Sequence, residues 1–224
     1  MALIAEDLLL LLLDDEDGTL LQQSFLDQAL AGAVLAELAA EGLVELGEER
    51  RWGAKPHVLA VRGAHTDDPV LATALERVAE KPRDAQGLLH PLAKGLRATL
   101  LDRLAERGVL RREEGRVLGL FRRTTWPAVD SAHEEQVRDE LEATLVHERP
   151  AAPRAAALIG LLHAIGVVHR VVDREGVSAA EVKRRAKAVA EGELASEAVG
   201  SAVQAMYVAI WTATIVPVIT TTTS

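Results

Sequence analysis

Lys94 and Arg97 form the strongest candidate binding site in the sequence. They lie three residues apart in the segment HPLAKGLRATLLDRLAERG, shortly after Pro91, where apolar residues recur at helical spacing. Residues three apart on one helix share a face, so we expect both cations side by side near a helix start. Two cations beside free backbone N–H groups favour binding of a phosphate or another anion. The pair therefore predicts an anion-binding site.

Basic residues gather in the same part of the chain. Nine basic and four acidic residues lie between Lys94 and Arg123, a local net charge of +5 in a chain whose formal net charge is −9. The overall charge argues against a nucleic-acid or anionic-membrane partner, whereas the local excess predicts a basic surface for an anionic one. An ordinary solvent-exposed helix face is the alternative. A second basic set on a later helix is interpreted as solvent-exposed: Lys183, Arg184, Arg185 and Lys187.

The sequence lacks the motifs of common catalytic and metal sites. It has no Gly-rich phosphate loop, no GxSxG elbow, no HExxH motif and no cysteine. His163 and His169 are six residues apart, which places them on different faces of a helix. His163 is interpreted as a hydrogen-bonded core residue, and residues 133–135 as the acidic first turn of an exposed helix. We therefore expect no enzyme activity, no metal and no cofactor.

The acidic segment DDEDG partly matches the calcium loop of an EF-hand. Asp15, Asp17 and Gly18 could fill the third, fifth and sixth loop positions. Leu13 and Ser24 would then stand at the first and twelfth positions, where the motif requires ligands. The match therefore does not predict a calcium site.

Two apolar stretches raise the question of a membrane. Residues 8–13 are six consecutive leucines, which span only about 9 Å as a helix and are flanked by acids rather than by a basic signal region. They predict a buried helix that ends in an acidic turn at Gly18. Residues 198–219 carry no charge and are long enough to cross a bilayer, but Gly200, Gln204 and Pro217 interrupt them. We expect a core helix near 198–216 that is buried on all sides, with a membrane span as the alternative.

These candidate residues must be positioned by a fold that the composition assigns to the mainly α class. The chain is 49% hydrophobic but only 3% aromatic, and no alternation of strands and helices indicates an α/β sheet. We predict one globular domain over residues 1–224, in which amphipathic helices surround a central buried helix. Two β-hairpins are predicted near 43–62 and 109–123. In the second, residues 109–110 pair with 117–121 across the turn REEG.

Local signals predict several element boundaries. A helix is expected over 69–79 after two aspartates, with a loop around Pro82. Ser178 and Glu181 match a capping box and predict a helix start. A helix that leads into a two-stranded wing also occurs in winged-helix DNA-binding proteins, which leaves that class as a lesser alternative.

Several motifs together resemble the Golgi phosphoprotein 3 family of peripheral membrane proteins. They are the opening EDLLLLLLDDEDG, the helix AGAVLAELAAEGLVEL, the block LLDRLAERGVL followed by a hairpin and TTWP, the stretch ALIGLLHA, and VKRRAKAV before an apolar C-terminus. In this order they cover nearly the whole chain. The lack of a basic N-terminal arm and the richness in Ala, Leu, Arg and Val indicate a bacterial member.

The resemblance implies binding of phosphatidylinositol 4-phosphate at the cytosolic face of a membrane, and an adaptor role in which protein clients are bound. In that family, two basic residues three apart on the helix before the hairpin contact the headgroup, and they fall on Lys94 and Arg97. A tryptophan and an arginine complete the pocket, and those positions fall on Gln22 and Ala31, which lack the ring and the charge. We therefore expect weaker or altered headgroup selectivity.

The family also uses its hairpin for self-association, which implies homo-oligomers of this chain. The residues that fall on the hairpin are Arg111, Arg112, Arg116, Phe121 and Arg122. We expect a cytoplasmic protein, peripheral on the cytosolic face of a membrane. The main alternative is an intracellular scaffold that binds proteins and does not bind lipid. Salt dependence separates the two, because binding through basic residues weakens as ionic strength rises.

Overall fold

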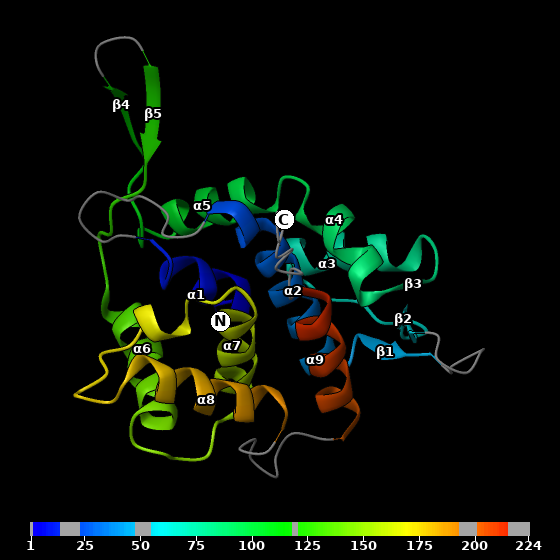
Figure 1. Cartoon of the computed structure of the whole chain (residues 1–224). Coiled ribbons are helices and arrows are strands. Elements are labelled where there is room, and N and C mark those ends of the chain that lie inside the picture. The colour runs from blue at the N-terminus through cyan, green and yellow to red at the C-terminus, as the bar shows by residue number, and fades with distance from the viewer. Residues whose placement is uncertain (1, 14–22, 48–54, 118–120, 193–200, 215–224) are drawn as a thin grey trace, which may run out of the picture.

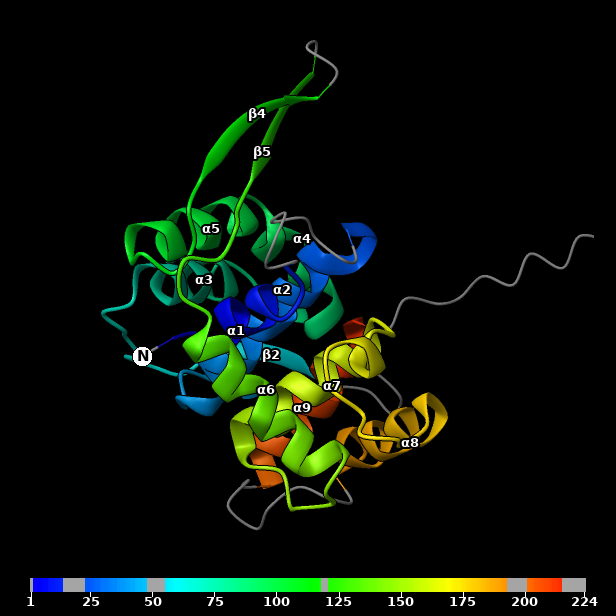
Figure 2. The same cartoon turned by 90° about the vertical axis from the view of Figure 1, so that its left-hand side faces the viewer.

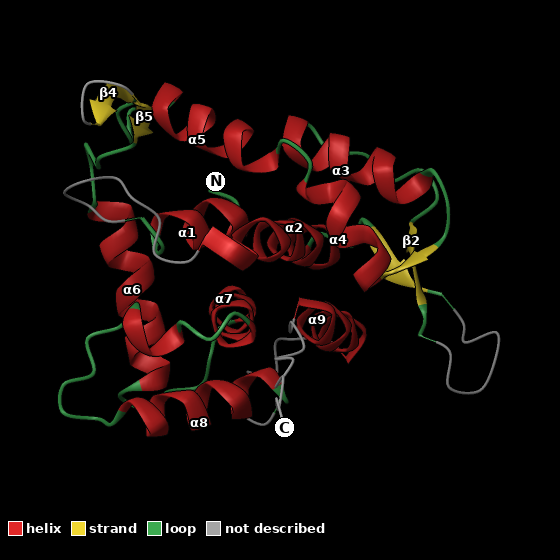
Figure 3. Ribbon diagram, turned by 45° about the horizontal axis from the view of Figure 1, so that its top comes forward, coloured by secondary structure: helices red, strands yellow, loops and turns green. Residues whose placement is uncertain are grey.

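Helix α2 (Gln23–Ala40) is the centre around which the other helices pack (Figure 3). The computed structural model describes residues 2–13, 23–47, 55–117, 121–192 and 201–214. Alanine and leucine fill most of α2, and nearly all of its side chains between Leu26 and Ala39 are buried. Such a helix, apolar on most faces, is stable only when other elements cover it. It contacts α1, α3, α4, α5, α7 and α9, so the fold has a central buried helix, as predicted, and this helix is α2. The sequence had indicated the C-terminal segment near 198–216 as the helix buried on all sides.

The leucine run forms part of the core, as predicted. Helix α1 (Ile4–Leu10) contains its first three leucines, and the next three continue as a turn. All six leucines are buried, and α1 packs against α2 and α7. The acidic turn predicted at residues 14–18 lies outside the described residues.

The first predicted hairpin is part of a three-stranded sheet. Strand β1 (Val44–Leu46) pairs antiparallel with β2 (His57–Ala60), with Val44 opposite Ala60. Strand β3 (Arg83–Asp84) pairs with the other edge of β2, so the prediction of a loop around Pro82 missed a strand. Two residues are too short to show the alternation that predicts a strand. Asp84 then caps α4 (Ala85–Ala93) by accepting the N–H of Gly87 at 2.8 Å.

Helix α3 (Pro69–Ala79) has the bounds that its sequence predicts. Its N-cap is Asp68, whose carboxylate accepts the N–H groups of Val70 at 2.9 Å and Leu71 at 3.2 Å. Pro69 at the first helical position lacks the N–H that would otherwise have no partner there. Asp68 and Pro69 are enough to predict where α3 begins, because both act directly on the first turn of the helix.

The second hairpin has a different register from the predicted one. After α5 (Leu96–Glu106), strand β4 (Glu113–Val117) pairs with β5 (Phe121–Thr125), with Glu113 opposite Thr125. The predicted turn residues 113–115 are therefore in a strand. Leu110 is buried and bridges Ala128 at the base of the hairpin, which moves the pairing toward the C-terminus. The hairpin projects away from the helices (Figures 1 and 2).

The second half of the chain is helical apart from its loops. It contains α6 (Ala132–Leu145), α7 (Pro153–Ala164), the short 3₁₀ helix η1 (Val168–Arg170), α8 (Ala179–Ala190) and α9 (Ser201–Thr214). The N-cap of α8 is Ser178, whose Oγ accepts the N–H of Glu181 at 3.1 Å. Only this half of the predicted capping box forms, because the Glu181 carboxylate contacts Arg184 and Arg185.

Helix α9 is buried on one side rather than on all sides. Tyr207, Ile210 and Trp211 face α2, α4 and α7, whereas Val208 is 39% exposed and Thr212 is also exposed. The prediction counted apolar residues, and it could not show that no described element covers the face of the helix with Val208 and Thr212. Within the described residues, no helix is both long and apolar enough to span a membrane. Together these elements form the single mainly α globular fold that was predicted.

Candidate functional site

Lys94 and Arg97 lie on two different helices, so the prediction that they share one helix face was wrong. Lys94 is the C-cap of α4, and Arg97 is in the first turn of α5. Gly95 between them has a φ of 78°, a left-handed conformation that glycine adopts without a steric penalty. The chain therefore turns sharply between the two cations. Pro91, which was read as preceding the helix, lies inside α4.

Arg97 is held by an acidic residue of the central helix. Its Nε and one terminal nitrogen lie 2.8 and 2.7 Å from Oδ1 of Asp27 on α2. The Arg97 side chain is 29% exposed and that of Asp27 is 45% exposed, so the pair is at the surface but only partly in water. Any anion that approaches Arg97 must compete with this carboxylate.

Lys94 is exposed and lines a cleft of about 440 Å³ between α3 and α5. Apolar side chains, Val34 and Leu92 among them, form part of its lining. Arg77 also lines the cleft, but it donates to the backbone carbonyls of Pro91 and Leu92 at the end of α4. Among the described residues, the Lys94 amine has neither a carboxylate nor a hydrogen-bond partner. It is therefore the cation of this cleft that is available to a ligand.

The two further positions taken from the family pocket do not add to the site. Ala31 lies on α2 and is 0% exposed, so it cannot contact a headgroup. The alignment made Ala31 a weaker candidate by position only, and its burial in the core corrects this. Gln22 lies outside the described residues.

The arginines at the base of the hairpin are paired with nearby acids. Arg111 contacts Glu113 at 2.6 Å, and Arg112 contacts Glu114 at 3.1 Å and lies 5.6 Å from the ring centre of Trp126. These contacts reduce the positive charge that the sequence predicted for this surface. Only the backbone of Arg116, Phe121 and Arg122 is described, and self-association through the hairpin stays a prediction.

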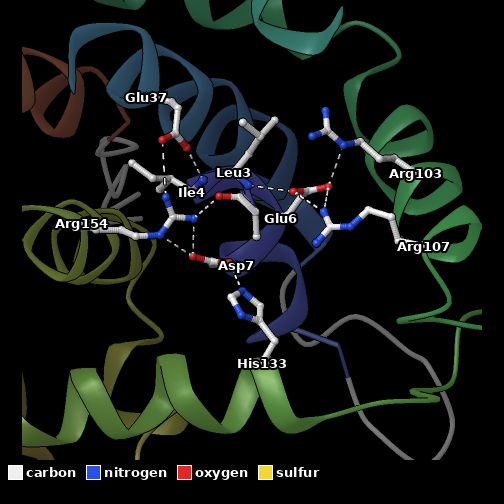
Figure 4. Close-up of polar contacts among 10 residues, drawn as sticks. Leu3, Ile4, Glu6, Asp7, Glu37, Arg103, Arg107, His133 and Arg154 are labelled. Atoms are coloured by element: carbon white, nitrogen blue, oxygen red, sulfur yellow. Dashed lines mark hydrogen bonds and ion pairs between the residues drawn. The ribbon is translucent and has the colours of Figure 1, made fainter. Parts of the chain in front are cut away.

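Two arginines of the predicted basic surface are directed into the protein. Figure 4 shows Arg103 and Arg107 of α5 converging on Glu6 of α1. The Glu6 carboxylate is 0% exposed and lies 3.1 Å from Arg103 Nε and 2.9 Å from Arg107. Its Oε2 also accepts the N–H of Leu3 at 2.7 Å, which caps α1. Arg103 and Arg107 therefore neutralise a buried acid, and Arg103 also contacts Asp68 at 2.6 Å.

A second buried acid, Asp7, joins three helices (Figure 4). Its Oδ2 lies 2.8 and 2.6 Å from two guanidinium nitrogens of Arg154 on α7. Its Oδ1 lies 2.8 Å from Nε2 of His133 on α6. His133 lies in the acidic first turn of α6, as interpreted, but the turn is not simply exposed, because the His133 ring contacts the buried Asp7. Glu134 beside it is also buried.

Arg154 also links Asp7 to the central helix. It lies 3.4 Å from Glu37 of α2 and donates to the carbonyl of Ala2 at 2.6 Å. Glu37 in turn accepts the N–H of Ile4. Burial raises the pKa of Glu37 above its ordinary value, although the bond from Ile4 and the Arg154 charge oppose this change. We call Glu6, Asp7, Glu37, Arg103, Arg107, His133 and Arg154 the buried ion network.

Sequence reasoning treated Glu6 and Asp7 only as acidic flanks of the leucine run. The one available signal was their position beside six leucines, because charged residues next to an apolar run are buried only when paired. Their partners are about 100 to 150 residues away in the chain. No three histidine, aspartate or glutamate side chains gather as a metal site in the part of the chain that the structure describes.

A comparison with protein families gives one match. The sequence profile of the family described as Golgi phosphoprotein 3 (GPP34) matches residues 4–206, which is nearly the whole chain. The matched range begins at the first residue of α1, four residues before the leucine run, and ends within α9. No curated protein matches the chain.

Proposed function

The chain belongs to the Golgi phosphoprotein 3 family, and from this premise we propose that it is a peripheral membrane protein without catalytic activity that binds an anionic phosphorylated headgroup. Phosphatidylinositol 4-phosphate is the headgroup that the family resemblance implies. The proposed contact is the surface where α4 meets α5. Lys94 would reach the phosphate, and the apolar lining of the cleft would sit behind it.

The observation that carries this proposal is the exposed amine of Lys94 at the edge of the cleft, which has no partner among the residues that the structure describes. Most neighbouring basic residues already have acidic partners: Arg97, Arg103, Arg107, Arg111 and Arg112. A lysine that is exposed and unpaired can bind a phosphate without first breaking an ion pair. Because the neighbouring arginines are paired, we expect the chain to bind the headgroup more weakly than a pocket of several unpaired cations would.

Vesicle flotation tests the proposal. The full chain would be mixed with phosphatidylcholine vesicles that contain phosphatidylinositol 4-phosphate, or enough phosphatidylserine to match its charge, or neither. We expect salt-sensitive binding to the anionic vesicles, and Lys94→Ala should reduce it about tenfold, the effect of one lost charge-assisted contact. Lys187→Ala is the matched control, because Lys187 is an exposed lysine on α8 that contacts Glu191.

Three outcomes would contradict this function. The first is that the wild-type chain does not float with any anionic vesicle, and the second is that its binding is the same at low and high salt. The third is an equal loss of binding in Lys94→Ala and Lys187→Ala, which would show a response to total charge. Preference for phosphatidylinositol 4-phosphate over phosphatidylserine at equal charge tests the headgroup itself.

Asp27→Asn is expected to strengthen binding to the same vesicles. The substitution removes the carboxylate that holds Arg97 while keeping the size of the side chain. Exposed ion pairs contribute up to about 1 kcal/mol, so freeing Arg97 should increase affinity about two- to fivefold. Asp139→Asn on α6 makes the same charge change on an exposed residue away from Arg97 and should have little effect. Equal gains in both variants would mean that Asp27 does not restrain Arg97.

A further inference from the structure

A second concave surface lies between η1 and α8, on the opposite side of the molecule from α5 (Figures 1 and 3). Residues 169, 170 and 172–178 line this pocket, which has a volume of about 770 Å³. None of them belongs to the Lys94 cleft or to the buried ion network. The proposed function above makes no use of this part of the chain.

Three cations around the pocket lack acidic partners. Arg170 and Arg174 line it, and Lys183 follows on α8; all three are exposed and have no carboxylate contact among the described residues. The two acids of the pocket have partners of their own. Asp173 accepts the N–H of Glu175 at 3.2 Å, and Glu175 lies 3.8 Å from His147.

Other cations of the neighbouring helix α8 are paired. Arg184 and Arg185 contact Glu181, and Lys187 contacts Glu191. Arg170, Arg174 and Lys183 lack such contacts among the described residues, and these three cations stand against two acids, Asp173 and Glu175, around the pocket.

His169, which lines this pocket, carries a buried polar atom. Nδ1 of His169 is shielded from solvent and has no hydrogen-bond partner among the described residues. Polar atoms in such a position are normally satisfied by protein, water or a ligand. Burial lowers the pKa of His169, and the charges of Lys183, Arg170 and Arg174 lower it further. The neutral ring can donate from Nδ1 to an anion.

The start of α8 supplies further donors. Ser178, which lines the pocket, caps the helix by accepting the N–H of Glu181 with its hydroxyl. The N–H groups of Ala179 and Ala180 in the same first turn have no intrahelical partner. Backbone N–H groups in that position favour an anion. This feature supports the site, which rests on the unpaired cations and on the buried His169 nitrogen.

We propose that this pocket binds a phosphate dianion, either free or as a phosphate ester. Arg170 and Arg174 supply charge-assisted hydrogen bonds, Lys183 adds a further positive charge, and His169 Nδ1 donates from the wall. The site uses residues separate from Lys94 and Arg97, so it stands independently of the proposed lipid binding. The bound phosphate would contact both the segment between η1 and α8, through Arg174, and α8 itself, through Lys183.

Titration with inorganic phosphate and with pyrophosphate, followed by NMR of the His169 ring in the full chain, tests this site. The His169→Gln variant assigns the resonance. We expect a saturable shift of the His169 signal, and the double variant Arg170→Gln with Arg174→Gln should bind at least about tenfold more weakly. The matched control is Arg184→Gln with Lys187→Gln, which removes the same charge from paired positions on α8 and should bind as the wild type does.

A second experiment distinguishes a phosphate on a lipid headgroup from a free phosphate compound. Flotation with phosphatidylinositol 4-phosphate vesicles, in a Lys94→Ala background, shows whether a lipid headgroup also occupies the pocket. If adding Arg170→Gln and Arg174→Gln removes the vesicle binding that remains in the Lys94→Ala variant, the pocket binds a lipid headgroup. If flotation stays unchanged while the pocket binds phosphate in solution, its ligand is a free phosphate compound. No shift of His169 with either anion, or equal weakening in both double variants, would overturn the proposal.

Discussion

Replacing Arg154 by methionine is expected to lower the free energy of unfolding by about 3–5 kcal/mol, the usual effect of removing one partner of a buried ion pair. Arg154 contacts Asp7, Glu37 and the carbonyl of Ala2, and the Asp7 carboxylate is 0% exposed. Methionine keeps the apolar stem but leaves two buried acids without their main cation. In a chain of this length the midpoint of thermal unfolding should fall by roughly 6–20 °C.

The control for this prediction is an arginine in an exposed pair. Arg184→Met removes the contact with Glu181, and exposed pairs of this kind contribute about 0–1 kcal/mol. Adding Asp7→Asn to Arg154→Met removes one of the two stranded charges and should restore part of the stability, which a double-mutant cycle measures. If Arg154→Met costs no more than Arg184→Met, Asp7 and Glu37 do not depend on Arg154.

Gly160→Ala should destabilise the protein, although alanine normally stabilises the interior of a helix by about 1 kcal/mol relative to glycine. Gly160 lies on α7 where the indole of Trp211 from α9 packs against the backbone. A Cβ at residue 160 would lie 2.1 Å from Cε2 of that ring. Forcing an extra methyl group into a packed contact costs about 1–3 kcal/mol, so the sign of the usual effect is reversed.

The dependence on Trp211 gives a direct check by urea denaturation. In a Trp211→Leu background the indole atoms nearest to Gly160 are absent, and there Gly160→Ala should stabilise the protein by up to about 1 kcal/mol. A change of sign between the two backgrounds locates the effect in the contact between α7 and α9. Stabilisation by Gly160→Ala in the wild-type background would show that the ring does not lie against α7.

The buried ion network explains why acids flank a leucine run in this fold. Glu6 caps its own helix and receives two arginines from α5, and Asp7 receives Arg154 from α7 and His133 from α6. These contacts connect helices from both halves of the chain. We expect that the arrangement of α5, α6 and α7 around α1 depends on them, which the Arg154 variant tests.

The sequence by itself determined the features that depend on neighbouring residues. Asp68 and Pro69 placed the start of α3, Ser178 placed the start of α8, and the six leucines indicated a core segment. Capping, proline geometry and apolar periodicity act within a few residues, so one stretch of sequence contains the information. The order of motifs likewise indicated the family over nearly the whole chain.

Only the tertiary structure decided which charges are available. Arg97 is restrained by Asp27, which is 70 residues away in the sequence, and Asp7 is paired with Arg154, which is 147 residues away. Counting charges between residues 94 and 123 could not separate arginines that face inward from a lysine that faces solvent. The two-residue strand β3 and the register of the second hairpin also depend on distant partners. Ion pairs and paired strands are contacts between segments that the fold brings together. The local sequence around one residue therefore does not identify its partner in another segment.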